Sequence, residues 1–126
     1  MAPQRDLGER LLEYGARIIK LVESLPKTLV GRRIGDQLLR SGMAVGANYE
    51  EARAAESTDD FVHKLQLALK ELRESHYWLR LLAAAKTLPP QRLYAITDES
   101  SQLIAILSKS VAKAKGKDKP PQAADF

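Results

Sequence analysis

Apolar residues recur along the first part of the chain at steps of three and four, the period of an amphipathic helix. The recurring positions are Leu7, Leu11, Ile18, Val22 and Leu25, with Tyr14 in register. This spacing predicts a helix from about Leu7 to Leu25, ended by Pro26. Asp6 and Glu9 have capping-box spacing, so we expect a carboxylate to satisfy free amides of the first turn.

A second helix is predicted from Lys27 or Thr28 to about Ala55, and it carries two neighbouring stripes. One stripe mixes apolar and polar residues: Ile34, Leu38, Ser41, Val45, Asn48 and Ala52. The other is rich in glycine: Gly31, Gly35, Leu39, Gly42, Gly46 and Tyr49. An interior glycine costs a helix roughly 1 kcal/mol relative to alanine. The glycine line therefore indicates close approach of another backbone, within the bundle or across a subunit contact, or else a weak or kinked helix.

Two further helices follow after short breaks. Ser57 and Asp60 repeat the capping-box spacing, which predicts a third helix from about Thr58 to Lys86. Its core stripe is Phe61, Leu65, Ala68, Leu72, Ser75, Leu79 and Leu82, and a second line carries Leu67, Glu71, Glu74, Trp78 and Leu81. After the Leu88-Pro89-Pro90 turn, a fourth helix is predicted from about Gln91 to Lys113. Its apolar face is Leu93, Ile96, Ser100, Leu103, Leu107 and Val111.

The chain shows no strand-like alternation of apolar and polar residues. Helices of similar length joined by short turns favour antiparallel neighbours. The sequence therefore predicts an all-α protein, an up-down-up-down antiparallel four-helix bundle over residues 1–115. Residues 116–126 are polar and contain prolines, so we expect them to form a disordered tail.

The net charge of +4 arises mostly near the end of the chain. Residues 109–126 contain five lysines and two aspartates, and the other 108 residues contain 15 basic and 14 acidic groups. A nucleic-acid hypothesis must therefore name a patch. The candidate basic residues are Lys27, Arg32 and Arg33 at the start of the second helix, and Lys109, Lys113 and Lys115 at the end of the fourth.

An up-down bundle places these two basic patches at opposite ends. Binding of RNA or DNA through either patch would be electrostatic and salt-sensitive, without base readout. The alternative is that these are solvated side chains that aid solubility.

Several kinds of chemistry have no support in the sequence. The absence of cysteine excludes disulfides and thiolate metal sites. Both histidines, His63 and His76, fall on the third helix, and neither completes the Glu-x-x-His pattern of a di-metal bundle. We therefore expect no metal, no cofactor and no catalytic residues. No run of about 18 apolar residues occurs, so we expect no membrane span and a cytoplasmic location.

Polar residues on the apparent inner faces need partners. Glu71 and Glu74 would each require a cationic or hydrogen-bonding group, and Arg40 is the first candidate. Such a network would fix helix register, or the same groups would serve a subunit contact or ligand site. Asn48 is expected to bond a neighbouring helix. Tyr77 and Trp78 are expected to be core or interface anchors rather than base-stacking platforms.

The segment from Arg40 to Leu82 carries a family resemblance. The matching motifs are Arg40-Ser41, Ala47-Asn48-Tyr49, Glu51-Ala52, Glu56-Ser57, Lys70-Glu71, Glu74 and Tyr77-Trp78-Leu79. Over about residues 7–110 the chain resembles four-helix-bundle proteins related to the ribosomal-RNA intervening-sequence protein. It departs from the pattern at Met43-Ala44, where a small hydroxyl pair is usual, and at His76.

The resemblance implies a cytoplasmic bacterial protein that assembles into a homo-oligomer, with a pentameric ring as the expected form. We expect a packing or assembly role for a set of residues in the matching segment: Arg40, Ser41, Gly42, Gly46, Asn48, Tyr49, Glu51, Glu71, Glu74, Tyr77 and Trp78. Similar bundles are accessory proteins of diversity-generating retroelements, where they bind nucleic acid and a reverse transcriptase. We therefore expect a non-enzymatic oligomer that binds nucleic acid or a nucleic-acid-processing partner. The alternative is a structural or protein-interaction scaffold without nucleic-acid binding.

Overall fold

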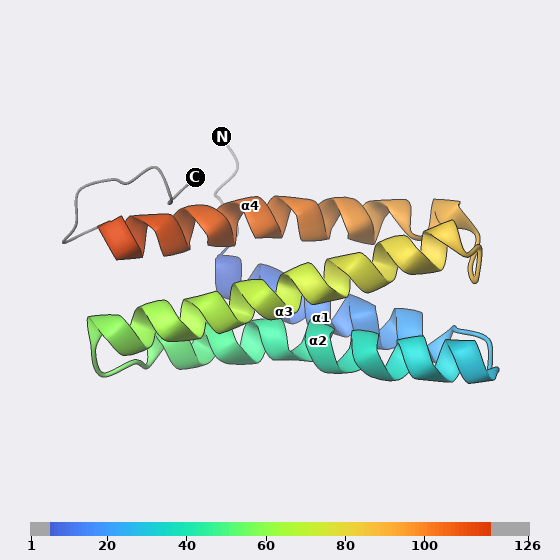
Figure 1. The fold of residues 1–126 in the computed structure, drawn as a ribbon, viewed down its shortest axis with the longest axis horizontal. Coiled ribbons are helices and arrows are strands. Elements are labelled where there is room, and N and C mark those ends of the chain that lie inside the picture. Colours follow the sequence, from blue (N-terminus) through green and yellow to red (C-terminus); the bar gives the residue numbers. More distant parts are fainter. Residues whose placement is uncertain (1–5, 117–126) are drawn as a thin grey trace.

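The computed structural model describes residues 6–116 and consists of four helices. They are α1 (Leu7–Glu23), α2 (Leu29–Arg53), α3 (Thr58–Ala84) and α4 (Tyr94–Gly116), with a short 3-10 turn, η1 (Pro90–Arg92), before α4. Successive helices run in opposite directions (Figure 1), and residues 6–116 contain no strand. The predicted all-α up-down-up-down bundle is confirmed. Beyond Gly116, which ends α4, the predicted tail lies outside the described residues.

The helix starts follow local capping chemistry at two positions but not at a third. The Thr28 hydroxyl accepts a hydrogen bond from the Gly31 amide at 3.1 Å, and the Ser57 hydroxyl accepts one from the Asp60 amide at 3.0 Å. These bonds satisfy amides that the helix itself leaves unpaired. Asp6 stands at the N-cap of α1, but its side chain makes no capping hydrogen bond, so that prediction is wrong.

The helix ends differ from the predicted ones by a few residues. At the end of α1, the Ser24 amide donates to the Leu21 carbonyl at 3.0 Å. This bond spans three residues, as in a 3-10 turn, instead of the four of an α-helix. The chain then leaves the helix before reaching Pro26. At Pro90 a 3-10 turn forms instead of the first turn of α4, because the Leu93 amide bonds the Pro90 carbonyl at 2.9 Å.

The core is built from the predicted stripes. The buried apolar residues of α3 and α4 are Leu65, Ala68, Leu72, Leu79, Leu82, Ile96, Leu103, Leu107 and Val111. Ser75 and Ser100 lie in the same stripes and are also buried. Phe61 is only partly buried.

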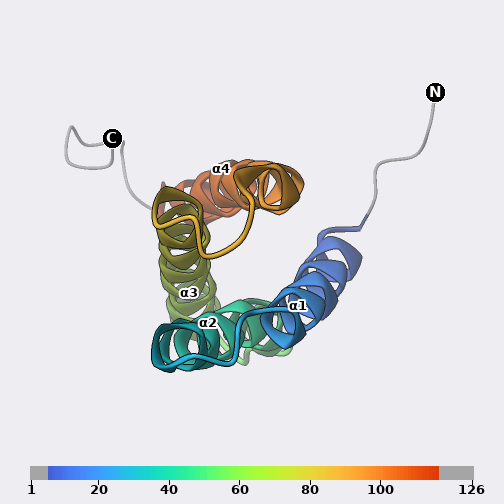
Figure 2. The same cartoon turned by 90° about the vertical axis from the view of Figure 1, so that its right-hand side faces the viewer.

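The four sides of the bundle are unequal. The α2–α3 contact is the most extensive, and the α1–α4 contact is far smaller. Viewed along the bundle, α1 lies beside α2 and α4 beside α3, while α1 and α4 are set apart (Figure 2). A clasp joins them: Arg10 donates to the two carboxylate oxygens of Glu99 at 2.7 and 3.2 Å. We call this fourth side the α1/α4 seam.

Candidate nucleic-acid interface

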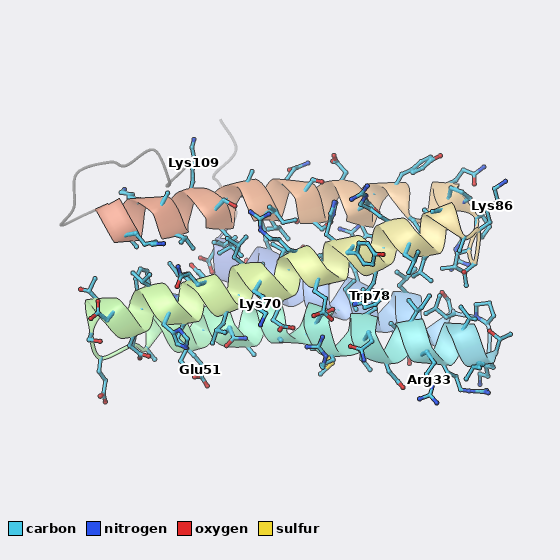
Figure 3. The ribbon with its side chains drawn as sticks, viewed as in Figure 1. Arg33, Glu51, Lys70, Trp78, Lys86 and Lys109 are labelled. Carbon is cyan, nitrogen blue, oxygen red and sulfur yellow. The ribbon has the colours of Figure 1, made fainter. Side chains whose placement is uncertain are left out.

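The two candidate basic patches lie at opposite ends of the bundle. Arg33 is near the start of α2, at the end that also carries Lys86, whereas Lys109 lies toward the other end of α4 (Figure 3). Arg92, in η1, is tied to Ser24 by a hydrogen bond of 3.2 Å and so also belongs to the first end. We define the basic end as Lys27, Arg32, Arg33, Lys86 and Arg92. The sequence did not point to Lys86 and Arg92, because only the fold brings the α3–α4 connection beside the α1–α2 connection.

The charge balance of the two halves differs strongly. Residues 17–36 and 80–99 lie in the half that contains the basic end, and they hold eight basic and four acidic residues. Residues 6–13, 50–64 and 109–116 lie in the other half and hold six basic and eight acidic residues. The lysines of α4 are therefore offset by carboxylates in their own half, whereas the basic end is not. This difference favours the basic end as the place where an anion would bind.

The side chains of the basic end have few internal partners. Within residues 6–116, Lys27, Arg33 and Lys86 make no ion pair closer than 4 Å. Arg32 donates to the Lys27 carbonyl at 3.0 Å, which holds the loop but leaves its positive charge unpaired. Cations that do not satisfy carboxylates remain free to contact phosphate.

The polar groups of α2 and α3 form a network on one edge of their contact. Arg40 donates to Glu71 at 2.8 Å and also binds Glu74, and the Trp78 indole donates to Glu74 at 3.0 Å. These side chains are partly exposed rather than buried: 50% for Arg40, 16% for Glu71 and 31% for Glu74. Tyr77 lies outside the network, 53% exposed, with its ring edge-on to Trp78 at 5.4 Å.

The network changes the chemistry of its central carboxylate. The Trp78 N–H, and after it the Arg40 guanidinium, hold the pKa of the Glu74 carboxyl below its usual value. The Glu74 carboxylate is therefore charged at neutral pH, and it accepts hydrogen bonds from both Trp78 and Arg40. The network can fix the register of α2 and α3, although its exposure limits the stability it adds.

The glycines of α2 bring α1 close. A Cβ added at Gly42 would lie 2.8 Å from Ile18 Cγ2, and one added at Gly31 would lie 2.0 Å from the Pro26 carbonyl oxygen. At Gly46 the nearest atom, the Leu11 carbonyl oxygen, would be 3.6 Å away, an ordinary contact. The glycine line faces α1 and the connection that follows it. A side chain at Gly42 would collide with Ile18 of α1, and one at Gly31 would collide with Pro26 of the connection.

Most of the remaining motif residues of α2 contact their own helix, and Glu51 contacts α3. Asn48 donates to the Ala44 carbonyl of its own helix at 2.9 Å, so the expected bond to a neighbouring helix is wrong. A short polar side chain can bond the preceding turn instead of reaching across. Ser41 likewise donates to the Gln37 carbonyl at 2.8 Å. The Glu51 carboxylate pairs with the Lys64 ammonium of α3 at 3.3 Å. The guanidinium carbon of Arg53 lies over the Tyr49 ring, 6.0 Å from the ring centre.

A second polar cluster, inside the core, was not apparent from the sequence. The Ser75 hydroxyl donates to the Leu72 carbonyl at 2.9 Å, so the Tyr14 hydroxyl is the donor in its 2.7 Å bond to Ser75. His76 Nδ1 lies 2.6 Å from the Ser100 hydroxyl. Burial, and secondarily the charge of Arg80, lower the pKa of His76. This cluster joins α1, α3 and α4 through residues far apart in sequence.

An apolar groove follows the outer edge of the α1–α2 contact. Its exposed side chains are Leu12, Ile19 and Met43, which are 75%, 40% and 51% exposed. Small residues form its floor, and the cavity volume is about 590 Å³. Exposed apolar surface of this kind marks contact sites for other molecules.

The part of the chain that the structure describes contains no helix long and apolar enough to cross a membrane. Residues 6–116 also contain no group of three or more His, Asp or Glu residues placed to hold a metal ion. The polar groups described above instead tie one helix to another. The fold and these contacts define an antiparallel helical-bundle protein with a basic end and an apolar side groove.

The chain belongs to the 23S rRNA-intervening sequence protein family, whose model matches residues 8–109. It is also similar to a crystal structure described as a protein with unknown function from the S23 ribosomal protein family of Bacteroides thetaiotaomicron. That similarity has a TM-score of 0.75 and 33% sequence identity, and covers 84% of this chain and 98% of the other. No match is found among curated proteins.

Proposed function

We propose that this protein is a non-enzymatic, self-associating helical bundle of the bacterial cytoplasm that binds nucleic acid through its basic end. The observation that carries this proposal is the charge asymmetry between the two halves of the bundle. Residues 17–36 and 80–99, in the half with the basic end, hold eight basic and four acidic residues, whereas the segments compared in the other half hold more acidic residues than basic ones. The family's name, which refers to an insertion in 23S ribosomal RNA, is consistent with a nucleic-acid partner.

The chemistry of the basic end fits phosphate groups rather than bases. Lysine and arginine side chains on loops and helix ends can contact a phosphate backbone without reading sequence. Binding would release counterions, and its strength would fall steeply with salt.

Neutralising the basic end is expected to weaken nucleic-acid binding selectively. The test variant is Lys27→Gln/Arg33→Gln/Lys86→Gln, because these side chains make no hydrogen bond or ion pair within residues 6–116 that folding would lose. If all of them contact phosphates, the slope of log affinity against log salt should become shallower by about 2 for a single strand. Fluorescence anisotropy with a labelled mixed-sequence oligonucleotide measures both the affinity and the slope.

The matched control is Lys109→Gln/Lys113→Gln/Lys115→Gln, which removes the same charge from the other half. This control should bind almost as tightly as the unmodified protein. A larger loss in the control than in the test variant would place the binding site on α4 and overturn this proposal. Equal small losses in both would exclude both patches as the main site and overturn this proposal, and no binding by the unmodified protein would favour the scaffold without nucleic-acid binding.

Self-association is proposed to use the apolar groove between α1 and α2. A Leu12→Glu substitution puts a charge on the most exposed apolar side chain of the groove, 75% exposed, without touching the core. We expect the solution mass, measured by light scattering, to fall toward the 14.0 kDa of one chain. The control Leu29→Glu changes another exposed leucine outside the groove and should leave the mass unchanged. A monomeric unmodified protein, or an unchanged mass for Leu12→Glu, would contradict this assignment.

A further inference from the structure

The α1/α4 seam is closed over only part of its length. Arg10 and Glu99 join the helices by two hydrogen bonds, and Arg10 also donates to Gln102 at 3.4 Å. These bonds commit the Glu99 carboxylate to Arg10. In the view from the basic end, α1 and α4 are set apart (Figure 2).

A groove of about 390 Å³ occupies this open part of the seam. It is lined by Ala16, Arg17, Lys20, Leu21, Arg92 and Ile96. Half of these lining side chains are cationic and none is acidic. Within residues 6–116, Lys20 makes only a weak pair with Glu23, at 3.6 Å between two exposed side chains, and Arg17 and Arg92 make no ion pair. The groove therefore carries uncompensated positive charge.

Arg92, which lines the groove, has its guanidinium tied to the connection between α1 and α2. Its Nη2 donates to the Ser24 hydroxyl at 3.2 Å, while that hydroxyl donates to the Leu21 carbonyl at 2.7 Å. Arg92 thus uses a single N–H of its guanidinium to bind Ser24. The other guanidinium N–H groups can donate to an oxyanion. Arg17 and Lys20 approach the same space from α1. Three cationic residues line one groove, and one of them has its guanidinium hydrogen-bonded to Ser24. This set of donors suits a phosphate group, whose oxygens accept several such bonds.

We propose that the groove in the α1/α4 seam binds a phosphate group, supplied by the backbone of the nucleic acid that contacts the basic end. This proposal rests on the function proposed above and extends the contact surface from the loops onto the side of the bundle. Arg92 belongs to both the basic end and the groove, so it joins the two. A strand bound at the end of the bundle would continue along the seam as far as the Arg10–Glu99 clasp.

The first test uses inorganic pyrophosphate as a probe, because it carries the phosphate chemistry without bases or sugar. Calorimetric titration compares the unmodified protein with Arg92→Gln and Lys20→Gln at constant ionic strength. We expect binding to weaken about tenfold in each variant, the range for one lost charge-assisted hydrogen bond. The Lys20 side chain is 85% exposed, so its replacement leaves folding intact even if Arg92→Gln disturbs the loop. The control is Arg73→Gln, an exposed cation on α3 outside the groove, which should bind pyrophosphate unchanged.

The second test separates a backbone phosphate from a free phosphate compound. With a labelled oligonucleotide, Lys20→Gln should make the salt slope shallower by about 0.7, the value for one lost contact to a single strand. Loss of pyrophosphate binding with an unchanged slope would assign the groove to a small phosphate compound and overturn the nucleic-acid source. No pyrophosphate binding and an unchanged slope would overturn the groove while leaving the basic end standing. Pyrophosphate binding by a protein that binds no oligonucleotide would refute both the proposed function and the nucleic-acid source of the phosphate, and would leave the groove as a site for a small phosphate compound.

Discussion

Gly42→Leu is expected to destabilise the bundle by about 2–3 kcal/mol, in the upper part of the roughly 1–3 kcal/mol typical for overpacking a close-packed core. Gly42 and Ile18 are both buried, and even a Cβ at Gly42 would lie 2.8 and 2.9 Å from two carbons of the Ile18 side chain. The larger side chain must push α1 away from α2. Leucine regains roughly 1 kcal/mol of helix propensity, which offsets only part of this cost. Urea denaturation followed by circular dichroism measures the change.

Gly46→Ala is the matched control for this substitution. A Cβ at Gly46 would meet its nearest neighbour at 3.6 Å, so no atom needs to move. Because alanine is the better helix former, the variant should be as stable as the unmodified protein or more stable by up to about 1 kcal/mol. Unchanged stability in Gly42→Leu would show that α1 does not pack on this line.

The protein is expected to lose about 2 kcal/mol of stability between pH 10 and pH 12 through Tyr14 alone. The Tyr14 side chain is fully buried, and burial raises the pKa of its hydroxyl to about 12 from its ordinary value of 10. The folded state therefore keeps the proton more tightly than the unfolded chain. Its contribution is fully present below pH 10, and it disappears as the pH rises through 12.

Tyr14→Phe isolates this contribution from other groups that titrate at high pH. At neutral pH the variant should lose about 1 kcal/mol, because Ser75 keeps its bond to the Leu72 carbonyl and loses only the one from Tyr14. Between pH 10 and 12 its stability should then fall by about 2 kcal/mol less than that of the unmodified protein. Denaturation curves at intervals across this range give the comparison. Parallel pH profiles for the two proteins would mean that Tyr14 is not held neutral by burial.

The helical pattern was predictable because burial repeats with the period of the helix. Leu65, Leu72 and Leu79 are each seven residues apart, about two helical turns, so they fall on the same buried face. This spacing is visible in a single sequence. Helix ends were less predictable, since they depend on bonds such as that from Leu93 to Pro90.

Contacts between helices were predictable only in part. Charge complementarity identifies Arg40 as the partner of Glu71 and Glu74 from the sequence. It does not predict that the three side chains are partly exposed to solvent. The helical period places Asn48 on a core stripe, yet its side-chain amide donates to the Ala44 carbonyl of its own helix. The pairing of Tyr14 with Ser75 joins residues 61 positions apart, and no local pattern encodes it. The sequence likewise predicts only three residues of the basic end, because Lys86 and Arg92 join it through the fold and not through sequence proximity.

A salt titration of binding by the unmodified protein tests the proposed function most directly. Affinity for mixed RNA and DNA oligonucleotides is measured over a range of chloride concentrations, with the solution mass checked at each one. If the five side chains of the basic end all contact phosphates, log affinity should fall linearly with log salt, with a slope of about −3.5 per subunit for a single strand. No binding at low salt, with the assembly intact, would contradict nucleic-acid binding by this protein.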